Sequence, residues 1–273
     1  MTPTYDKARL CEVLKDRNQT LAMARYFVEK AIEEEKQAAS DPLWLKFFST
    51  ALDSFAIGGI ERIYEYAESP IELVFLNSLV MCFIKADPLK LIVMPPSNNA
   101  PRVMSEFRAY HSKCLSLKSN YHKVTGNEKL GGFTNHLKSL VADGQASTEE
   151  MQLIEHHILL LDALNLYDNF HLIPQAGFPE FKVEGKSIRP DILIWIPGNE
   201  HLRLIVECDG YEFHSGKDKF ETDRKRDRLL KKHGYEVLRY SGSEIVKDPI
   251  AVSTELFEFL EAQEVPTSHS CLN

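Results

Sequence analysis

Two short apolar runs separated by turn-forming residues stand out in the C-terminal third of the chain. Ile192–Ile196 and Leu202–Val206 are rich in branched apolar residues, and they flank the segment Pro197–Glu200. This pattern predicts two strands joined as a hairpin. Asp191 precedes the first run and Glu207 follows the second, at equal distances from Asn199 within the turn. The hairpin would therefore set two carboxylates opposite each other at its open end.

A third acidic residue follows the second run. Because side chains alternate along a strand, Glu207 and Asp209 share one face and Cys208 points to the other. Carboxylates that converge in this way repel one another unless a cation lies between them, and hard divalent cations prefer oxygen ligands. The sequence therefore predicts a Mg²⁺ or Mn²⁺ site, to which the backbone carbonyl of Cys208 could add a further oxygen. We interpret the Cys208 side chain itself as a small core residue.

A basic helix is expected beyond the hairpin. Gly210–Gly216 has the composition of a turn and contains His214, Phe220–His233 is typical of a helix that Gly234 closes, and Tyr235–Tyr240 reads as another strand. A strand, helix and strand in succession favour a right-handed crossover to a parallel neighbour. The helix could contact phosphate groups through its basic residues, of which we select Arg224, Lys225, Arg226 and Arg228. The alternative is a solvated helix face.

These motifs in this order resemble the PD-(D/E)XK nuclease superfamily, and within it the restriction-endonuclease-like branch that includes the very-short-patch repair endonucleases. The resemblance extends from about Leu172 to Ile245, and it rests on Pro190-Asp191, Glu207-Cys208-Asp209-Gly210, His214, the basic helix and the Gly-Tyr-x-Val-x-Arg strand. It implies an α/β fold with an α-β-β-β-α-β core, a mixed sheet flanked by helices. It also implies metal-dependent hydrolysis of phosphodiester bonds, with DNA as the expected partner and RNA still open.

The resemblance also implies roles for individual residues. Asp191 and Glu207 would hold the metal, and Asp209 stands where the superfamily has its lysine, so that Asp209 or His214 would position the attacking water. Ser69-Pro70-Ile71-Glu72 begins a helix far upstream and matches a motif whose glutamate reaches the metal site. Glu72 is alternatively a helix-start carboxylate near the positive end of the helix dipole, and His214 is alternatively an exposed loop histidine.

The rest of the chain is predicted to be mainly helical. We expect an N-terminal helical region over 1–66, interrupted at Gly58-Gly59, and a first core helix over 67–85. A helical insertion over 86–170, with a short strand at Leu89–Met94, separates this helix from the nuclease core over 171–264, and a flexible tail follows over 265–273. His171–Phe178 with Phe181–Val183 is predicted as the first core strand, and Glu184–Ser187 as its turn. The insertion could shape the substrate groove or bind a protein partner.

Composition limits the class of protein. The formal net charge of −8 over 273 residues argues against tight binding of bulk nucleic acid through charge alone, although local basic patches remain available. The five cysteines form no C-x-x-C pair, which favours a reducing compartment. No leader opens the sequence, and its longest uncharged apolar segment is shorter than the roughly 20 residues that span a bilayer. We therefore expect a soluble, cytoplasmic protein that has no membrane partner.

Other chemistries fit less well. His111, Cys114 and His122 lie close in sequence, but a fourth zinc ligand is not evident. Gly185-Lys186-Ser187 is not a phosphate loop because position 180 is Glu where that motif requires Gly. Two alternatives to a nuclease remain: a catalytically inactive module that binds nucleic acid, and a structural subunit of a larger assembly.

Overall fold

The fold is described from a computed structural model that covers residues 7–38, 42–126, 130–158, 166–210 and 217–263. By their internal contacts the residues form two units, one of 1–100 with 169–273 and the other of 101–168. The predicted tail and His214 lie outside the described residues. No helix within the described ranges is long and apolar enough to cross a membrane.

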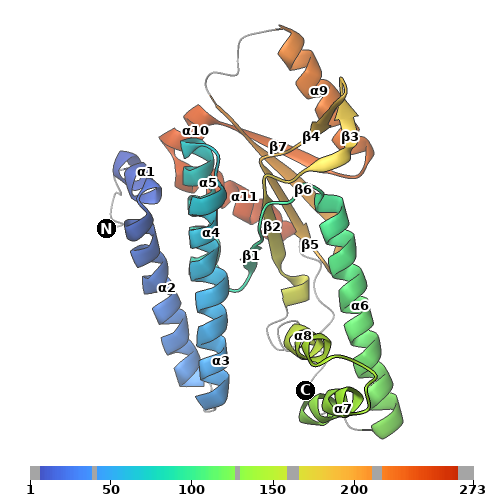
Figure 1. The fold of residues 1–273 in the computed structure, drawn as a ribbon. Helices are drawn as coiled ribbons and strands as arrows, with labels where there is room; N and C mark the ends of the chain where they lie inside the picture. The colour runs from blue at the N-terminus through green and yellow to red at the C-terminus, as the bar shows by residue number, and fades with distance from the viewer. Residues whose placement is uncertain (1–6, 39–41, 127–129, 159–165, 211–216, 264–273) are drawn as a thin grey trace. The chain divides into compact units, whose positions relative to one another are not determined.

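The larger unit is built around a mixed five-stranded sheet (Figure 1). Its strand order is β1-β2-β5-β6-β7. β1 pairs parallel with β2, β2 and β5 pair antiparallel, β5 and β6 pair antiparallel, and β6 and β7 pair parallel. The strands are β1 (Leu91–Val93), β2 (Phe170–Pro174), β5 (Ile192–Ile196), β6 (Asn199–Asp209) and β7 (Glu236–Ser241).

The predicted hairpin is confirmed, and so is its register. Ile192 pairs with Val206, so Asp191 and Glu207 are the next residues outward on β5 and β6. β5 is buried along its whole length because it lies in the middle of the sheet. The turn is tighter than the four residues predicted, since β6 already begins at Asn199.

The predicted crossover is also confirmed. Helix α9 (Lys217–Lys232) connects β6 to β7, and the two strands pair in parallel. Gly234 follows the helix with φ of 81°, a left-handed conformation that glycine adopts without steric cost. In sequence order α5, β2, β5, β6, α9 and β7 are compatible with a restriction-endonuclease-like core, to which β1 adds an edge strand.

The first core helix begins as the sequence predicts. α5 (Pro70–Ala86) has Ser69 as its N-cap, whose hydroxyl accepts a hydrogen bond from the Glu72 backbone N–H, and Pro70 in its first turn. The helix is buried on nearly every side because it packs against α11 (Pro249–Ala262) and the sheet. It is therefore a central helix of this unit.

The prediction of one long first core strand was wrong. Strand β2 ends at Pro174, and Gln175 has a φ of 49°, which turns the chain away from the sheet. The following residues form a separate two-stranded sheet of β3 (Phe178–Val183) and β4 (Lys186–Ile188). The turn that joins them is shorter than predicted, with Glu184 and Gly185 at positive φ and Lys186 already in β4.

The remaining helices of this unit lie at the two ends of the chain. α1 (Lys7–Lys15), α2 (Arg17–Ala38), α3 (Pro42–Leu52) and α4 (Gly58–Tyr66) precede α5, and α10 (Gly242–Lys247) precedes α11. The predicted break at Gly58-Gly59 was wrong, because a π-helical turn at Asp53–Ile57 links α3 directly to α4. A side chain at position 59 would contact Val93 of β1, so the small residue there allows close packing rather than a break.

The smaller unit is helical. It contains most of α6 (Ala100–Thr125), α7 (Leu130–Ala142) and α8 (Thr148–Ile158), followed by a short 3-10 turn at Leu166–Asp168. Its core gathers apolar side chains from all three helices, among them Tyr121, Phe133 and Ile154. The helical character predicted for this part of the chain is therefore confirmed for the residues described.

Candidate functional site

Four carboxylates converge at the end of the sheet where β5 begins and β6 ends. Burial raises the pKa of the Cys208 thiol well above its ordinary value, and negative charges add to this effect. Those charges belong to Asp191, Glu72, Glu207 and Asp209. The structure thus brings together every acidic residue that the sequence singled out.

Asp191 is fixed by the backbone on both sides. Its Oδ2 accepts a hydrogen bond of 2.8 Å from the Cys208 N–H, which ties the carboxylate across the hairpin to β6. Its carbonyl oxygen accepts a hydrogen bond of 2.6 Å from the Gln175 N–H. Burial raises the pKa of Asp191, although the Cys208 N–H and the charge of Arg226 lower it. The carboxylate is held in place without full compensation of its charge.

Glu207 is the most buried of the four, with 4% of its surface exposed. Burial raises its pKa to about 7, even though the charge of Arg226 opposes the shift. The Arg226 guanidinium, on α9, donates a hydrogen bond from Nη2 to Oε1 of Glu207. The same Nη2 lies 3.4 Å from the Arg189 carbonyl oxygen. One of the residues predicted to bind nucleic acid therefore points into the acidic centre.

Glu72 reaches this centre from the first turn of α5. Its Oε2 accepts hydrogen bonds from the Glu68 N–H at 3.1 Å and from Nε2 of Gln175 at 2.8 Å. Burial raises the pKa of Glu72, and the charge of Asp191 raises it further. Glu72 therefore combines both predicted interpretations, since it lies in a helix start and is also held, 8% exposed, among the other acids.

Asp209 is paired with Arg239 across β6 and β7. Nη1 of Arg239 lies 3.1 Å from Oδ1 of Asp209, and Nη2 donates to Oδ1 of Asp227 on α9 at 2.8 Å. Burial lowers the pKa of Arg239, but Asp227 and Asp209 together raise it above its ordinary value. Arg239 thus links the end of β6 to α9. It also fixes the side chain of Asp209, the residue that stands where the resembling superfamily has its lysine.

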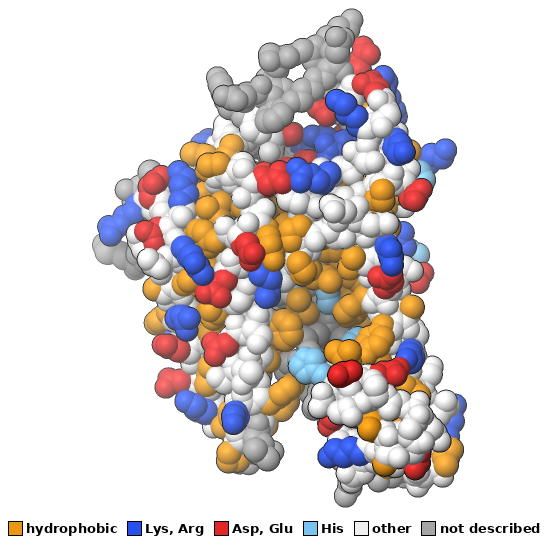
Figure 2. All heavy atoms as spheres, viewed as in Figure 1, with side chains coloured by type: hydrophobic (Ala, Val, Ile, Leu, Met, Phe, Trp, Pro, Cys, Tyr) orange, Lys and Arg blue, Asp and Glu red, His pale blue; other side chains and the backbone are white. Residues whose placement is uncertain are grey.

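A third arginine, Arg189, lies beside the site. Arg189 donates from both terminal nitrogens to the two carboxylate oxygens of Glu68, at 2.7 Å each. This two-pronged pair joins the segment just before α5, which carries Glu72 in its first turn, to the segment before β5, which contains Asp191. In Figure 2 acidic and basic side chains lie side by side over the upper part of the molecule.

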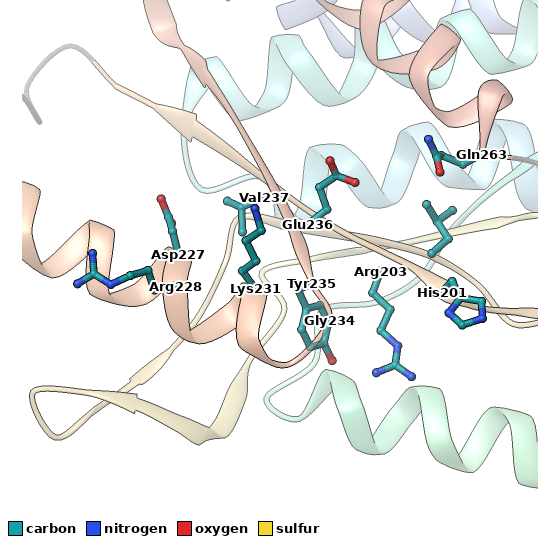
Figure 3. A pocket seen from close by; sticks show the side chains of 11 residues that line it. His201, Arg203, Asp227, Arg228, Lys231, Gly234, Tyr235, Glu236, Val237 and Gln263 are labelled. Atoms are coloured by element: carbon teal, nitrogen blue, oxygen red, sulfur yellow. The ribbon is translucent and has the colours of Figure 1, made fainter.

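The other basic residues selected from α9 do not reach the carboxylates. Lys225 pairs with Glu184 at 3.0 Å, on the β3–β4 hairpin, and Arg224 and Arg228 are exposed. Arg228 also borders a pocket of about 510 Å³ that shares only Asp227 with the groups described above. In Figure 3 the side chains around this pocket diverge, with Arg203 and Tyr235 pointing to one side and Lys231 to the other. The pocket is distinct from the acidic centre.

The donor set of the acidic centre fits a divalent cation. Carboxylate oxygens are the ligands that Mg²⁺ and Mn²⁺ prefer, and two guanidinium groups compensate at most two of the four negative charges. As the side chains stand, no three His, Cys, Asp or Glu residues in the described part of the chain have the spacing of a metal site. This includes the set of His111, Cys114 and His122. The acidic centre has the chemistry of a cation site, with Arg226 against its most buried carboxylate.

Three contributors were not selected from the sequence. Gln175 carries no specific signal in the sequence, because a polar residue on a strand is common. Arg239 belongs to the Gly-Tyr-x-Val-x-Arg strand and was used only as part of that motif. The ion pair of Glu68 and Arg189 gave no signal, because 121 residues separate its members.

The fold and the site together define an α/β protein with an acidic centre at the edge of a mixed sheet. Residues 170–260 match the family REase_MTES_1575, a restriction endonuclease-like family. The matched segment holds β2 to β7 and most of α11, and with them Asp191, Glu207 and Asp209. The match supports a restriction-endonuclease-like nuclease fold in this part of the chain. No curated protein and no solved structure matches the chain.

Proposed function

We propose that the protein is a metal-dependent nuclease that hydrolyses phosphodiester bonds, with DNA as its substrate and internal bonds as its targets. One observation carries the proposal: the carboxylates of Asp191, Glu207 and Glu72 come from three separate parts of the fold and lie near enough to Cys208 for their charges to raise the pKa of its thiol. The Cys208 N–H binds Asp191, and Gln175 binds both Glu72 and the Asp191 carbonyl oxygen. Burying several carboxylates together is costly unless they bind a cation, and such centres are typical of functional sites. The match to a restriction endonuclease-like family supports the same reaction class.

The reaction is a hydrolysis. The oxygen of a water molecule forms a bond to phosphorus while the ester bond to the leaving oxygen breaks, the leaving oxygen takes a proton and the other product is a phosphate monoester. Asp191 and Glu207 would hold Mg²⁺ or Mn²⁺, with Glu72 as a further ligand and the Cys208 carbonyl as a fourth oxygen. A cation bound there would lower the pKa of the attacking water and neutralise charge on the phosphate.

The protein groups have separate tasks in this proposal. Asp191 is oriented by the Cys208 N–H, and Glu72 by Gln175 and the Glu68 N–H, which limits the positions that both carboxylates can take beside a cation. Asp209, oriented by Arg239, or His214 would position the water. The exposed basic groups of α9, Arg224, Lys225 and Arg228, would contact backbone phosphates on either side of the cleaved bond.

The likeness of Glu207-Cys208-Asp209-Gly210 to the very-short-patch repair branch is part of the proposal. The helices of the smaller unit are proposed to shape the substrate path or to bind a protein partner. We propose a cytoplasmic location, where nucleic acid is accessible and free cysteines such as Cys11 and Cys114 stay reduced.

The test is cleavage of supercoiled, linear and single-stranded DNA, and of RNA, in Mg²⁺, Mn²⁺ or EDTA. Asp191→Asn is the matched variant because it keeps the shape of the side chain and removes one charge. We expect cleavage that needs the metal and is lost in the variant. If wild type and variant are equally inactive while both bind DNA, the chain is an inactive binding module instead. Loss of both cleavage and binding would favour a structural subunit.

A further inference from the structure

Phosphodiester hydrolysis requires positive charge beside the reacting phosphate. Negative charge builds up on the phosphate oxygens and on the leaving oxygen, and arginine or lysine side chains commonly stabilise it. The sequence has Asp209 where a lysine would supply this charge in the superfamily that it resembles. The positively charged side chain that stabilises the phosphate must therefore come from another position in the chain.

Within the described residues, three arginines pair with acids in or beside the site. Two of them have their guanidinium groups held by two or more charged hydrogen bonds. Arg239 bridges Asp209 and Asp227, and Arg189 is engaged by both oxygens of Glu68. Arg239 lies between two carboxylates, and Arg189 binds both oxygens of one carboxylate. These paired hydrogen bonds hold each guanidinium group in one orientation. Neither could turn to a substrate without breaking two charged hydrogen bonds.

Arg226 is bound differently. Within the described residues its hydrogen bonds are made by Nη2, to Glu207 and to the Arg189 carbonyl oxygen. Its Nε is buried and has no hydrogen-bond partner within the described residues. A buried donor without an acceptor costs on the order of 1–3 kcal/mol, so the guanidinium has a donor that an additional oxygen ligand would satisfy.

The location of Arg226 also suits the task. It lies on α9 two residues, or about half a helical turn, from each of the exposed bases Arg224 and Arg228, so its side chain projects from a different face of the helix. That side chain is 21% exposed and contacts Glu207. Its charge acts on both Asp191 and Glu207, since it lowers the pKa of each. Among the basic residues selected from α9, Arg226 is the one that contacts a carboxylate of the acidic centre.

We propose that Arg226 is a catalytic residue, which pairs with Glu207 in the free protein and contacts a nonbridging oxygen of the cleaved phosphate when substrate is bound. This inference rests on the proposed nuclease function. An incoming phosphate would present oxygen acceptors to the guanidinium at the same place where Glu207 is needed as a cation ligand. In the free protein Arg226 thus neutralises the buried carboxylate of Glu207. When substrate and the metal ion bind, the metal ion takes the place of Arg226 beside Glu207.

The experiment compares Arg226→Gln and Arg226→Lys with the wild type. Arg25→Gln is the control, because Arg25 is an exposed arginine on α2 outside the proposed site. Three quantities are measured: kcat and KM for DNA cleavage, the affinity for Mn²⁺ by calorimetry without DNA, and the thermal midpoint. Arg226→Ala is assayed with added guanidinium ion, which can occupy the space that the side chain leaves.

We expect kcat to fall about 10²- to 10³-fold in Arg226→Gln, the size of effect seen when one donor to a developing charge is removed. Arg226→Lys keeps the charge but loses the planar arrangement of donors, so its kcat should lie between those of wild type and Arg226→Gln. The affinity for Mn²⁺ should be equal or higher in Arg226→Gln, because a competitor for Glu207 is gone. Guanidinium should restore part of the kcat of Arg226→Ala.

Two results would overturn the inference. One is a kcat in Arg226→Gln and Arg226→Lys like that of wild type and Arg25→Gln. The other is a loss of Mn²⁺ affinity in proportion to the loss of activity without rescue by guanidinium, which would make Arg226 a support of Glu207 only. If Arg226→Gln does not fold, the kcat of Arg226→Lys and the rescue of Arg226→Ala by guanidinium decide whether the inference holds. An inactive wild type would instead count against the nuclease function itself.

Discussion

Nε2 of Gln175 lies 2.8 Å from Oε2 of Glu72, although 103 residues separate them in the sequence. Gln175 is 7% exposed, and its φ of 49° is a left-handed conformation that costs a residue with a side chain about 1–2 kcal/mol. The strained residue also donates its backbone N–H to the Asp191 carbonyl oxygen. It therefore joins the carboxylate of Glu72 to the backbone of Asp191, two residues that are proposed to hold the metal.

Replacing Gln175 should separate the contribution of its side chain from that of its backbone. Gln175→Ala loses the donor to Glu72 and keeps the strain, so we expect a loss of about 1.5–3 kcal/mol in the free energy of unfolding. Gln175→Gly also loses the donor but relieves the strain, and should be more stable than Gln175→Ala by about 1 kcal/mol. Urea unfolding of the three proteins measures both differences. Equal stability of the two variants would show that the left-handed conformation is not costly here.

The buried charge of Glu207 should make stability depend on pH. Its pKa is raised to about 7 in the folded protein, above the ordinary value of 4.5, so the folded state binds a proton more tightly than the unfolded state. The contribution of Glu207 to the free energy of unfolding is therefore fully present below about pH 4.5. It is lost as the pH rises through about 7, by roughly 3 kcal/mol in all. Glu207→Gln should remove this loss.

The measurement is the difference in unfolding free energy between Glu207→Gln and wild type at pH 5 and pH 8, without divalent metal. We expect the variant to gain relative to wild type at pH 8. Adding Mg²⁺ at pH 8 should stabilise the wild type and not the variant, because a cation that binds only the folded protein raises its stability. A difference that does not change with pH would mean that Arg226 fully compensates Glu207.

Arg239 should be sensitive to conservative replacement. Lysine keeps the charge but does not bridge Asp209 and Asp227 in the way that a guanidinium does. We expect Arg239→Lys to cost about 1–2 kcal/mol, a modest value because both carboxylates are 36% exposed. In the double variant Arg239→Lys with Asp227→Asn, the second change should cost less than it does alone. Additive effects in this cycle would contradict the bridge.

Gly177 should not accept a side chain. A Cβ atom there would lie 2.6 Å from the Asn98 carbonyl oxygen, which is backbone and does not move aside easily. Gly177→Ala should lower the free energy of unfolding by about 1–3 kcal/mol. Gly59→Ala is the control, since its Cβ would meet Val93 at 3.4 Å within a helix, where alanine is favoured. Thermal unfolding of both variants checks the difference, and equal midpoints would be inconsistent with the close approach.

The elements of the core were predictable because each has a local cause. The alternation and length of Ile192–Ile196 and Leu202–Val206 predict paired strands, and Ser69 with Pro70 predicts the start of α5. The register that sets Asp191 opposite Glu207 follows from symmetry about Asn199, and a register shift between Trp195 and Ile196 lets a tighter turn close the hairpin. These patterns depend on neighbours within a few residues, which a sequence displays directly.

Other features depended on contacts between distant segments. The sequence suggests one strand through Gln175, yet the chain turns there because the Gln175 amide and N–H serve Glu72 and Asp191. The Gly58-Gly59 pair suggests a break, yet close packing of α4 on β1 uses Gly59 within a helix. Local propensity gives way where packing and buried hydrogen bonds stabilise another conformation.

The sequence by itself determined which acids stand at the ends of which strands, since strand periodicity places Asp191, Glu207 and Asp209 at one edge. Only the tertiary structure decided how their charges are compensated. Arg226 meets Glu207, Arg239 meets Asp209 and Gln175 meets Glu72 because helix α9, strand β7 and the end of strand β2 pack around the same point. Electrostatic pairing acts through space, and separation along the chain carries no information about it.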